Sequence, residues 1–185
     1  MKELVWSHSL EKHHEIKHNL LNSFDNMEKQ TDRNKFESIT YTDYFNKTPH
    51  EHRPYTFIFI NALDDFFDNF KKYYCTNEFL IINCWFQQYY KNDNHEWHIH
   101  SETNLSLVYY IELDNKDKST EFYDSVKKEK FQLDVKEGDI VVFPSFIPHR
   151  SPRIVTDNRK TIISCNINLI DLDMNLINIG VQSFK

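Results

Sequence analysis

The chain has 185 residues, a length that gives one domain a real hydrophobic core and leaves room for an N-terminal extension. Lysine and arginine number 22 against 28 aspartates and glutamates, a formal net charge of -6 at pH 7, so no basic field attracts a phosphate backbone and we expect no nucleic-acid partner. Only Gly138 and Gly180 are glycines, which excludes the glycine-rich loops of the Rossmann and P-loop nucleotide-binding classes.

The start of the chain, MKELVWSHSLEKHHEIKH, carries charges where a signal peptide needs an apolar stretch. No apolar run approaches the length of a membrane span, so we expect no membrane partner. The three cysteines, Cys75, Cys84 and Cys165, are far apart and odd in number, which fits neither a disulfide framework nor a paired-cysteine zinc site. We therefore expect a soluble, cytoplasmic protein.

Two helices are predicted in the first part of the chain. From about Ser9 to Lys29 apolar residues recur near helical spacing between charged ones, which predicts a surface helix that packs one face. Residues 30–56 are polar, contain two prolines and show no sustained period, so they are predicted to be a loop-rich connection. Between Phe57 and Tyr74 one broad apolar and aromatic face predicts a second helix, packed in the core.

After Asn77 the pattern changes to strands. The chain contains the short β-branched or aromatic segments FLIINCWFQQYY, NLSLVYYIEL, TEFYD, KFQLDV, DIVVFP and KTIISCNINL, separated by polar turns. This spacing is typical of an antiparallel sandwich or barrel. We therefore predict one α+β, mainly β domain over 1–185, in which residues 1–76 brace a jelly-roll core at 77–170 and residues 171–185 form a C-terminal extension.

Three histidines form a candidate metal site. His98 and His100 are separated by one residue, so on a strand both imidazoles leave from the same face and make half of such a site. The best third ligand is His149, which follows a short buried strand that ends at Pro144. A lone histidine is more often a structural residue, but this pair with the GDIVVFP…PH context reverses that preference. Nitrogen-rich sites with open positions suit Fe(II), and also Mn, Ni, Cu or Zn. His95, in a polar turn, is expected to face solvent, with the mouth of the metal site as the alternative.

The stretch from about Trp85 to Asn168, somewhat under half of the chain, resembles the double-stranded β-helix of Fe(II)/2-oxoglutarate dioxygenases. The likeness is to prolyl-hydroxylase-like enzymes and to phage or marine-bacterial oxygenases of this type. Their first metal motif is His-x-Asp or a variant, matched by His98 and His100, and their distal histidine is matched by His149. The resemblance implies a cupin-like jelly roll with Fe(II) as metal and 2-oxoglutarate as co-substrate.

The resemblance also implies three residues that bind the co-substrate. A basic residue about ten positions after the distal histidine anchors the remote carboxylate of 2-oxoglutarate in this family, and Arg159 stands ten positions after His149. Thr161 matches the Ser or Thr that often follows, and Tyr110 resembles the second tyrosine of the Tyr-Tyr-Leu of prolyl hydroxylases. A buried carboxylate costs on the order of several kcal/mol unless it is paired, and a guanidinium fork provides that pairing.

Position 100 departs from the family pattern, because most members have a carboxylate there. A neutral ligand leaves the metal site one unit more positive. Three alternatives stay open: an active three-histidine iron site, recruitment of a carboxylate such as Glu102 or Asp124, or a cupin with another metal and no 2-oxoglutarate. Arg159 together with Thr161 favours the oxygenase.

The expected function is therefore an Fe(II)- and 2-oxoglutarate-dependent dioxygenase that hydroxylates an unactivated C–H bond. The alternative is a cupin-type metal-binding protein, or a three-histidine metal dioxygenase that does not use 2-oxoglutarate. The substrate is a small molecule or a peptide. The Tyr-Tyr-Ile resemblance suggests prolyl side chains, while other amino acids are equally compatible with the sequence. A homodimeric assembly stays open.

Overall fold

The structure is a computed structural model that describes residues 1–28, 30–33 and 38–177, the side chain of Arg33 excepted. Its helices are α1 (His13–Asp25), α2 (Pro54–Ile60) and α3 (Asp64–Tyr74), with short 3₁₀ helices η1 (Lys2–Leu4) and η2 (His50–His52). Its strands are β1 (Trp6–Ser9), β2 (Gln30–Arg33), β3 (Ser38–Thr42), β4 (Thr76–Tyr89), β5 (His95–His98), β6 (Leu105–Glu112), β7 (Glu121–Asp124), β8 (Glu129–Gln132), β9 (Asp139–Pro144), β10 (His149–Ser151) and β11 (Lys160–Leu172). Within the described ranges, no helix has both the length and the apolar character needed to cross a bilayer.

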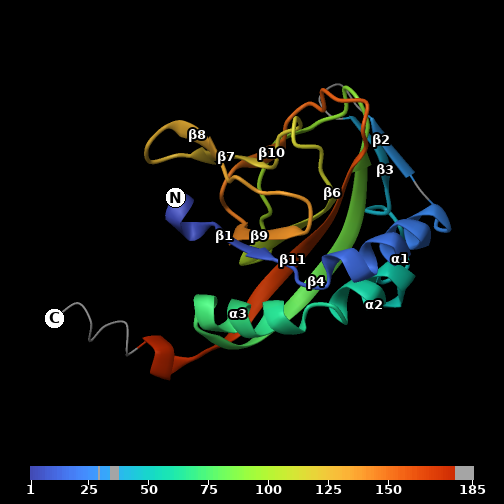
Figure 1. Cartoon of the computed structure of the whole chain (residues 1–185). Coiled ribbons are helices and arrows are strands. Elements are labelled where there is room, and N and C mark those ends of the chain that lie inside the picture. The colour runs from blue at the N-terminus through green and yellow to red at the C-terminus, as the bar shows by residue number, and fades with distance from the viewer. Residues whose placement is uncertain (29, 34–37, 178–185) are drawn as a thin grey trace.

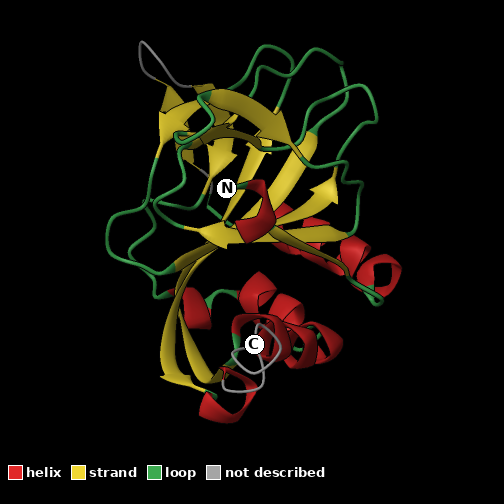
Figure 2. Ribbon diagram, turned by 90° about the vertical axis from the view of Figure 1, so that its left-hand side faces the viewer, coloured by secondary structure: helices red, strands yellow, loops and turns green. Residues whose placement is uncertain are grey.

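The strands form two antiparallel sheets that enclose an interior (Figure 1 and Figure 2). The larger sheet has seven strands in the order β1-β9-β6-β11-β4-β3-β2, and the smaller has four in the order β5-β10-β7-β8. Strands that are distant in sequence are neighbours in both sheets, as in a jelly roll and unlike a meander. The predicted jelly-roll fold with helical bracing is confirmed.

The three α-helices cover the outer face of the seven-stranded sheet (Figure 1). Phe24 of α1 stacks on Phe86 of β4 with ring centroids 4.4 Å apart, and Phe59 of α2 stacks on Tyr109 of β6 at 5.1 Å. All four rings are fully buried. Each such side chain stabilises the fold by about 1.5–3 kcal/mol relative to an exposed position, so this face is the main structural core.

The predicted single helix over residues 57–74 is two helices, α2 and α3. Pro54 opens α2, where a proline is tolerated because the first helical N–H groups lack partners in any case. Asp64 and Asp65 occupy the first turn of α3, where carboxylates interact favourably with the positive end of the helix dipole. The apolar face continues across the break, so periodicity alone merges the two helices.

The N-terminal region contributes strands as well as helices, which differs from the predicted loop-rich connection. β3 pairs with β4 through Tyr41 opposite Gln88 and Thr42 opposite Gln87, and β2 pairs with β3. At the other edge of the same sheet β1 pairs with β9. Residues before 77 therefore complete the jelly-roll sheet on both sides.

A buried ion pair fixes the segment that follows β3. The carboxylate of Asp43 accepts hydrogen bonds from Nη1 of Arg53, the hydroxyl of Tyr55 and the backbone N–H of Phe86, each at 2.8 Å. Both charged side chains of the pair are almost fully buried. Because loss of one partner of a buried pair leaves the other unpaired, this contact holds the segment, which includes Tyr44, firmly against β4.

Gly138 has a conformational reason to be glycine. It precedes β9 with φ of +94°, in the region that side chains with a Cβ avoid. An added Cβ would also lie 3.0 Å from Cγ of the buried His13. The glycine of the GDIVVFP motif is therefore required by the turn and its packing, independently of any metal chemistry.

Candidate metal centre and adjoining cavities

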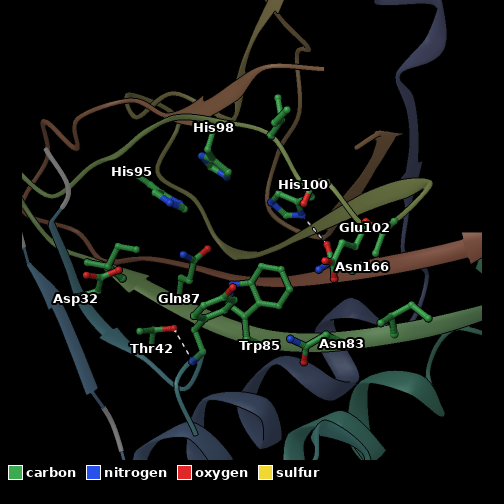
Figure 3. Close-up of a pocket in the computed structure, with 16 residues that line it drawn as sticks. Asp32, Thr42, Asn83, Trp85, Gln87, His95, His98, His100, Glu102 and Asn166 are labelled. Carbon is green, nitrogen blue, oxygen red and sulfur yellow. Dashed lines mark hydrogen bonds between the residues drawn. The ribbon is translucent and has the colours of Figure 1, made fainter. Parts of the chain in front are cut away.

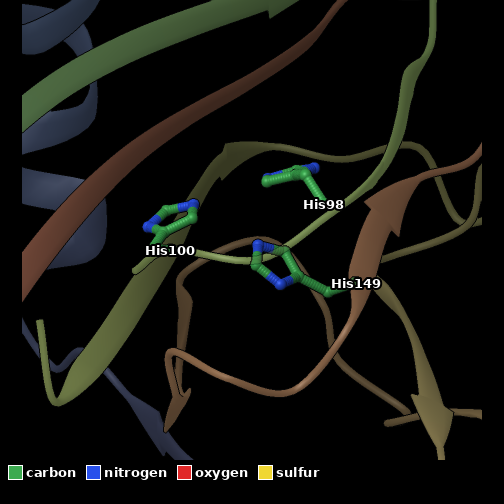
Figure 4. Close-up of side chains that lie close together, drawn as sticks. All are labelled: His98, His100 and His149. Atoms are coloured by element: carbon green, nitrogen blue, oxygen red, sulfur yellow. The ribbon is translucent and has the colours of Figure 1, made fainter. Parts of the chain in front are cut away.

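The three predicted imidazoles lie together at one end of the small sheet (Figure 4). His98 ends β5, His149 begins β10 directly opposite it, and His100 follows two residues after His98. One nitrogen from each ring can be chosen so that all three lie within 4.8 Å of one another. Among the residues that the structure describes, this is the group of potential ligands that could hold a metal ion.

Each of the three rings has an acceptor at Nδ1. Nδ1 of His98 lies 2.7 Å from the carbonyl oxygen of Glu96, and Nδ1 of His149 lies 2.9 Å from that of Ile147. Nδ1 of His100 lies 2.5 Å from Oδ1 of Asn166. A carbonyl oxygen can only accept, so Nδ1 donates in the first two rings, and the same assignment suits the amide oxygen of Asn166. The lone pair is then on Nε2 of each ring, which is the arrangement that orients imidazoles around a metal.

Burial favours the neutral form of two of these rings, those of His149 and His100. The pKa of His149 is well below its ordinary value, because burial disfavours the cation and the neighbouring His98 adds repulsion. Burial likewise lowers the pKa of His100, against the hydrogen bond to Asn166. Neutral imidazole is the form that binds a metal, so burial favours the ligating form of His149 and His100.

His95 does not face solvent as predicted. Its ring stacks on that of His98 with centroids 4.0 Å apart, and it lines both cavities of the site. Burial, with repulsion from His98, lowers the pKa of His95 to about 3. His95 is the first residue of β5, and tertiary packing brings its ring against His98 at the mouth of the metal site, which the local sequence does not reveal.

Neither carboxylate that could replace His100 joins the cluster. Glu102 lines the outer cavity with an exposed side chain. Asp124 binds the N-terminal ammonium group of Met1 at 2.8 Å, and it accepts from backbone N–H groups of the turn after β7. The three-histidine set is the one that the geometry brings together.

Arg159 directly precedes β11, and Thr161 is the second residue of that strand. Nε and Nη2 of Arg159 donate to the carboxylate of Glu112 at 2.7 and 3.0 Å, and the Thr161 hydroxyl donates to the same carboxylate. The strand face of Thr161 also carries Ile163, which packs in the core beneath the helices. Neither residue lines the described cavities, because successive side chains of a strand point to opposite faces.

Tyr110 points into the interior between the sheets. Its hydroxyl donates to Oγ1 of Thr120 at 2.8 Å and accepts from the backbone N–H of the same residue at 3.0 Å. Burial raises the pKa of Tyr110 to about 12, so the phenol stays protonated at neutral pH. The predicted tyrosine therefore lies on the same side of the sheet as the imidazoles.

Lys160 is a buried cation beside Tyr110 that sequence reasoning missed. Its Nζ donates to the carbonyl oxygen of Lys118 at 3.1 Å and to Oγ of Ser151 at 3.0 Å, and it lies 5.8 Å from the ring centroid of Tyr110. Burial lowers the pKa of Lys160 to about 8, against the smaller opposing effect of the carboxylate of Asp117, which makes no hydrogen bond to it among the described residues. The sequence contains one indication of this position. Lys160 and Ser164 are an even number of residues apart on one strand, so they lie on the same face, and Ser164 lines the inner cavity.

Two connected cavities adjoin the imidazoles. The outer one has a volume of about 550 Å³ and is shown in Figure 3, with Trp85 and Gln87 of β4 on its floor. The inner one, of about 30 Å³, reaches Ser151 and Thr120, the partners of Lys160 and Tyr110. Both cavities are lined by the same five side chains at their junction, Trp85, Gln87, His95, His98 and His100.

No protein-family model matches this sequence, and no curated protein matches it. Solved structures do match. An oxidoreductase of the 2OG-Fe(II) oxygenase family from Burkholderia pseudomallei superposes with a TM-score of 0.73 at 12% identity, over 92% of this chain and 88% of that one. A prolyl-4-hydroxylase from Pseudomonas putida gives 0.64 at 11% identity, over 90% and 93%. HygX from Streptomyces hygroscopicus, with nickel and 2-oxoglutarate bound, gives 0.67 at 8%, over 90% and 83%.

These likenesses define the fold class. The chain has the double-stranded β-helix fold of the 2OG-Fe(II) oxygenases and prolyl hydroxylases, as the sequence resemblance predicted. Within this fold it carries three convergent imidazoles beside two connected cavities.

Proposed function

We propose that this protein is an Fe(II)- and 2-oxoglutarate-dependent oxygenase that hydroxylates an unactivated C–H bond. The observation that carries the proposal is the convergence of His98, His100 and His149 in a fold shared with such enzymes. Related folds are known with a metal and the co-substrate in place, as in HygX with nickel and 2-oxoglutarate.

The donor set fits a divalent transition metal. Three neutral imidazoles with Nδ1 satisfied leave three Nε2 lone pairs on one side, and Fe(II) accepts nitrogen ligands with further positions open. His98, His100 and His149 would hold the metal. Asn166 and Ser106, both within hydrogen-bonding distance of Nδ1 of His100, would fix the ring that replaces the usual carboxylate.

The surroundings of Lys160 fit the remote carboxylate of 2-oxoglutarate. A buried ammonium with neutral partners favours an incoming anion, because pairing offsets the cost of its burial. We therefore assign to Lys160 the anchoring role first predicted for Arg159, which is engaged by Glu112. Tyr110 would add its hydroxyl. Because the inner cavity measures about 30 Å³, its side chains must move apart when a dicarboxylate enters.

The residues of this chain would bind, orient and shield. When bound, Fe(II) and 2-oxoglutarate supply the oxidising chemistry that attacks the substrate C–H bond. The stacked His95 and the indole of Trp85 restrict water at the junction of the cavities, which limits side reactions there. The outer cavity would hold a small molecule or a side chain of a peptide beside the metal.

A second candidate is a metal-binding protein or dioxygenase that does not use 2-oxoglutarate. The neutral three-imidazole donor set favours it, because most 2-oxoglutarate enzymes of this fold add a carboxylate ligand. The two functions differ in one property, the response of the bound metal to the oxo acid.

Anaerobic titration with Fe(II) and then 2-oxoglutarate tests the proposal. The wild-type protein is expected to develop a visible charge-transfer absorption as the oxo acid binds. Lys160→Met should raise the concentration of 2-oxoglutarate needed by at least about tenfold, because a buried charge pair is lost. Under oxygen, succinate should appear and a hydroxylated product should gain one oxygen atom in mass.

The matched control is Arg159→Gln, which should leave the titration within about twofold of wild type. Metal binding without a response to 2-oxoglutarate would move the assignment to the second candidate. A loss in Arg159→Gln with none in Lys160→Met would return the anchoring role to the arginine.

A further inference from the structure

The two cavities differ in charge. Around the inner cavity the charged groups include two cations, Lys160 in the wall behind Ser151 and Arg150 on its lining. Arg150 forms an ion pair with Glu121 at 2.6 Å. The two groups that accept hydrogen bonds from Lys160, the carbonyl oxygen of Lys118 and the hydroxyl of Ser151, are both neutral. The inner end therefore suits an anion.

The outer cavity has the opposite character. Its charged lining residues are Asp32 and Glu102, and no described lysine or arginine side chain lines it. Figure 3 shows the two carboxylates at opposite ends of the cavity, with the indole of Trp85 between them.

The remaining lining supplies an aromatic and amide environment. Trp85 is almost fully buried and stacks edge-on with the half-exposed Tyr44, with ring centroids 5.2 Å apart. Asn83, Gln87 and Asn166 add amide oxygens that accept hydrogen bonds. Aromatic faces, carboxylates and amide oxygens all interact favourably with an ammonium or guanidinium group.

We propose that the outer cavity takes a cationic substrate, an aliphatic amine or guanidine, either free or as the side chain of a lysine or arginine in a peptide. This inference rests on the proposed function, since the substrate must lie beside the imidazoles. The aliphatic part contacts Trp85 and Ile99, and the cationic group lies toward Glu102. A volume of about 550 Å³ accommodates such a chain with several waters.

Binding to the metal-free protein tests the cavity separately from catalysis. Pentylamine, pentanoate and pentanol are titrated by calorimetry at low salt, because they share one chain and differ in charge. The amine is expected to bind about tenfold more tightly than the carboxylate, with an affinity that falls as salt rises. Acetylated and amidated tripeptides with central lysine, arginine or glutamate form the second arm and distinguish a peptide from a free amine.

Two charge variants and one control complete the test. Glu102→Gln and Asp32→Asn, singly and together, should weaken binding of the cation by about three- to tenfold and leave pentanol unchanged. Glu129→Gln, in an exposed position on β8 of the other sheet, should change neither. With Fe(II) and 2-oxoglutarate, the preferred cation should also stimulate succinate formation.

Three results would overturn the inference: pentanoate binding as tightly as the amine, no binding by any cation, or cation affinity untouched in the double variant. Failure of the metal and oxo-acid titration with intact cation binding would instead overturn the proposed function and leave the charge preference of the cavity standing.

Discussion

The two faces of the seven-stranded sheet have different tasks although the same strands build both. On the helix side, β4 and β11 present Phe86 and Ile163 to a closed aromatic and aliphatic core. On the other side the neighbouring residues Gln87 and Ser164 line the cavity beside the imidazoles, and their side chains approach at 3.5 Å. Side chains alternate between the two faces of a strand, so adjacent residues lie on opposite sides of the sheet. One residue therefore packs in the core, while the next one lines the cavity beside the imidazoles.

The basic residues at the start of β11 show the consequence most clearly. Arg159, directly before the strand, and Thr161, on its helix side, both bind Glu112. Lys160 lies between them in sequence and points into the interior. For the residue that would anchor 2-oxoglutarate, a count of ten positions from His149 points to Arg159. The face of the strand on which a residue lies points instead to Lys160. The following predictions test this division between the faces, from the largest expected effect to the smallest.

Phe86→Ala should be the most damaging change to stability. The ring is fully buried against Phe24 and Tyr55, so its removal leaves a cavity and should lower the free energy of unfolding by about 3–5 kcal/mol. Urea denaturation measures the loss. Metal binding per folded molecule should be unchanged, and a loss of metal affinity in the folded fraction would mean that the two faces are not independent.

His149→Ala should affect metal binding more than the stability of the fold. Removal of one of three ligands should weaken Fe(II) or Co(II) binding by at least about 100-fold, measured by anaerobic calorimetry. His14→Ala, at an exposed position of α1, is the matched control and should bind the metal like wild type. Equal affinity in both variants would remove His149 from the metal centre.

Lys160 should make the stability of the metal-free protein, and its binding of a dicarboxylate, depend on pH. Its folded pKa of about 8 lies below the ordinary value of 10.5, so between these values the unfolded chain binds the additional proton. The stability of the metal-free protein should therefore rise with pH through this window relative to Lys160→Met, by at most about 1.4 kcal/mol per pH unit. Dicarboxylate binding should weaken over the same range, because the neutral amine no longer attracts it.

Thermal denaturation of wild type and Lys160→Met from pH 7 to 10.5 measures the difference. Parallel curves for the two proteins would show that this lysine has an ordinary pKa and hence a solvated environment.

Arg159→Gln should have the smallest effect. The arginine and Glu112 form a two-point ion pair at a partly exposed position, so the cost should be about 1 kcal/mol, and less at high salt. Denaturation at two salt concentrations measures it. A much larger loss would place the pair in the core of the fold.

The sequence alone predicted a large part of this architecture. The strand-rich half after Asn77, the helical bracing and the aromatic stripe of α2 and α3 all follow from periodicity, which reports how a segment is buried. The same pattern merged α2 with α3, because their apolar face runs on across the break. It also missed β2 and β3, whose polar residues become strands because β3 pairs with β4 and β2 pairs with β3. Propensity is weak where tertiary contacts decide.

For the candidate site, the sequence supplied the ligand types and their spacing. The pair His98 and His100 follows from period two on an extended segment, and His149 follows from the resemblance and its position after a buried strand. That the three rings meet depends on the pairing of β5 with β10, which joins residues about fifty positions apart and which local pattern cannot encode. The inward turn of His95 and the two cavities depend on packing of the same kind.

What the sequence determined by itself is a β-rich jelly roll with helices against one sheet and imidazoles spaced for a metal. Only the tertiary structure decided which basic residue enters the interior, where Glu102 and Asp32 lie relative to the imidazoles, and that Glu112 engages Arg159. The physical reason is that the composition of a strand is local, whereas register and sheet pairing set which face each residue occupies, and these form between segments that are distant in the chain.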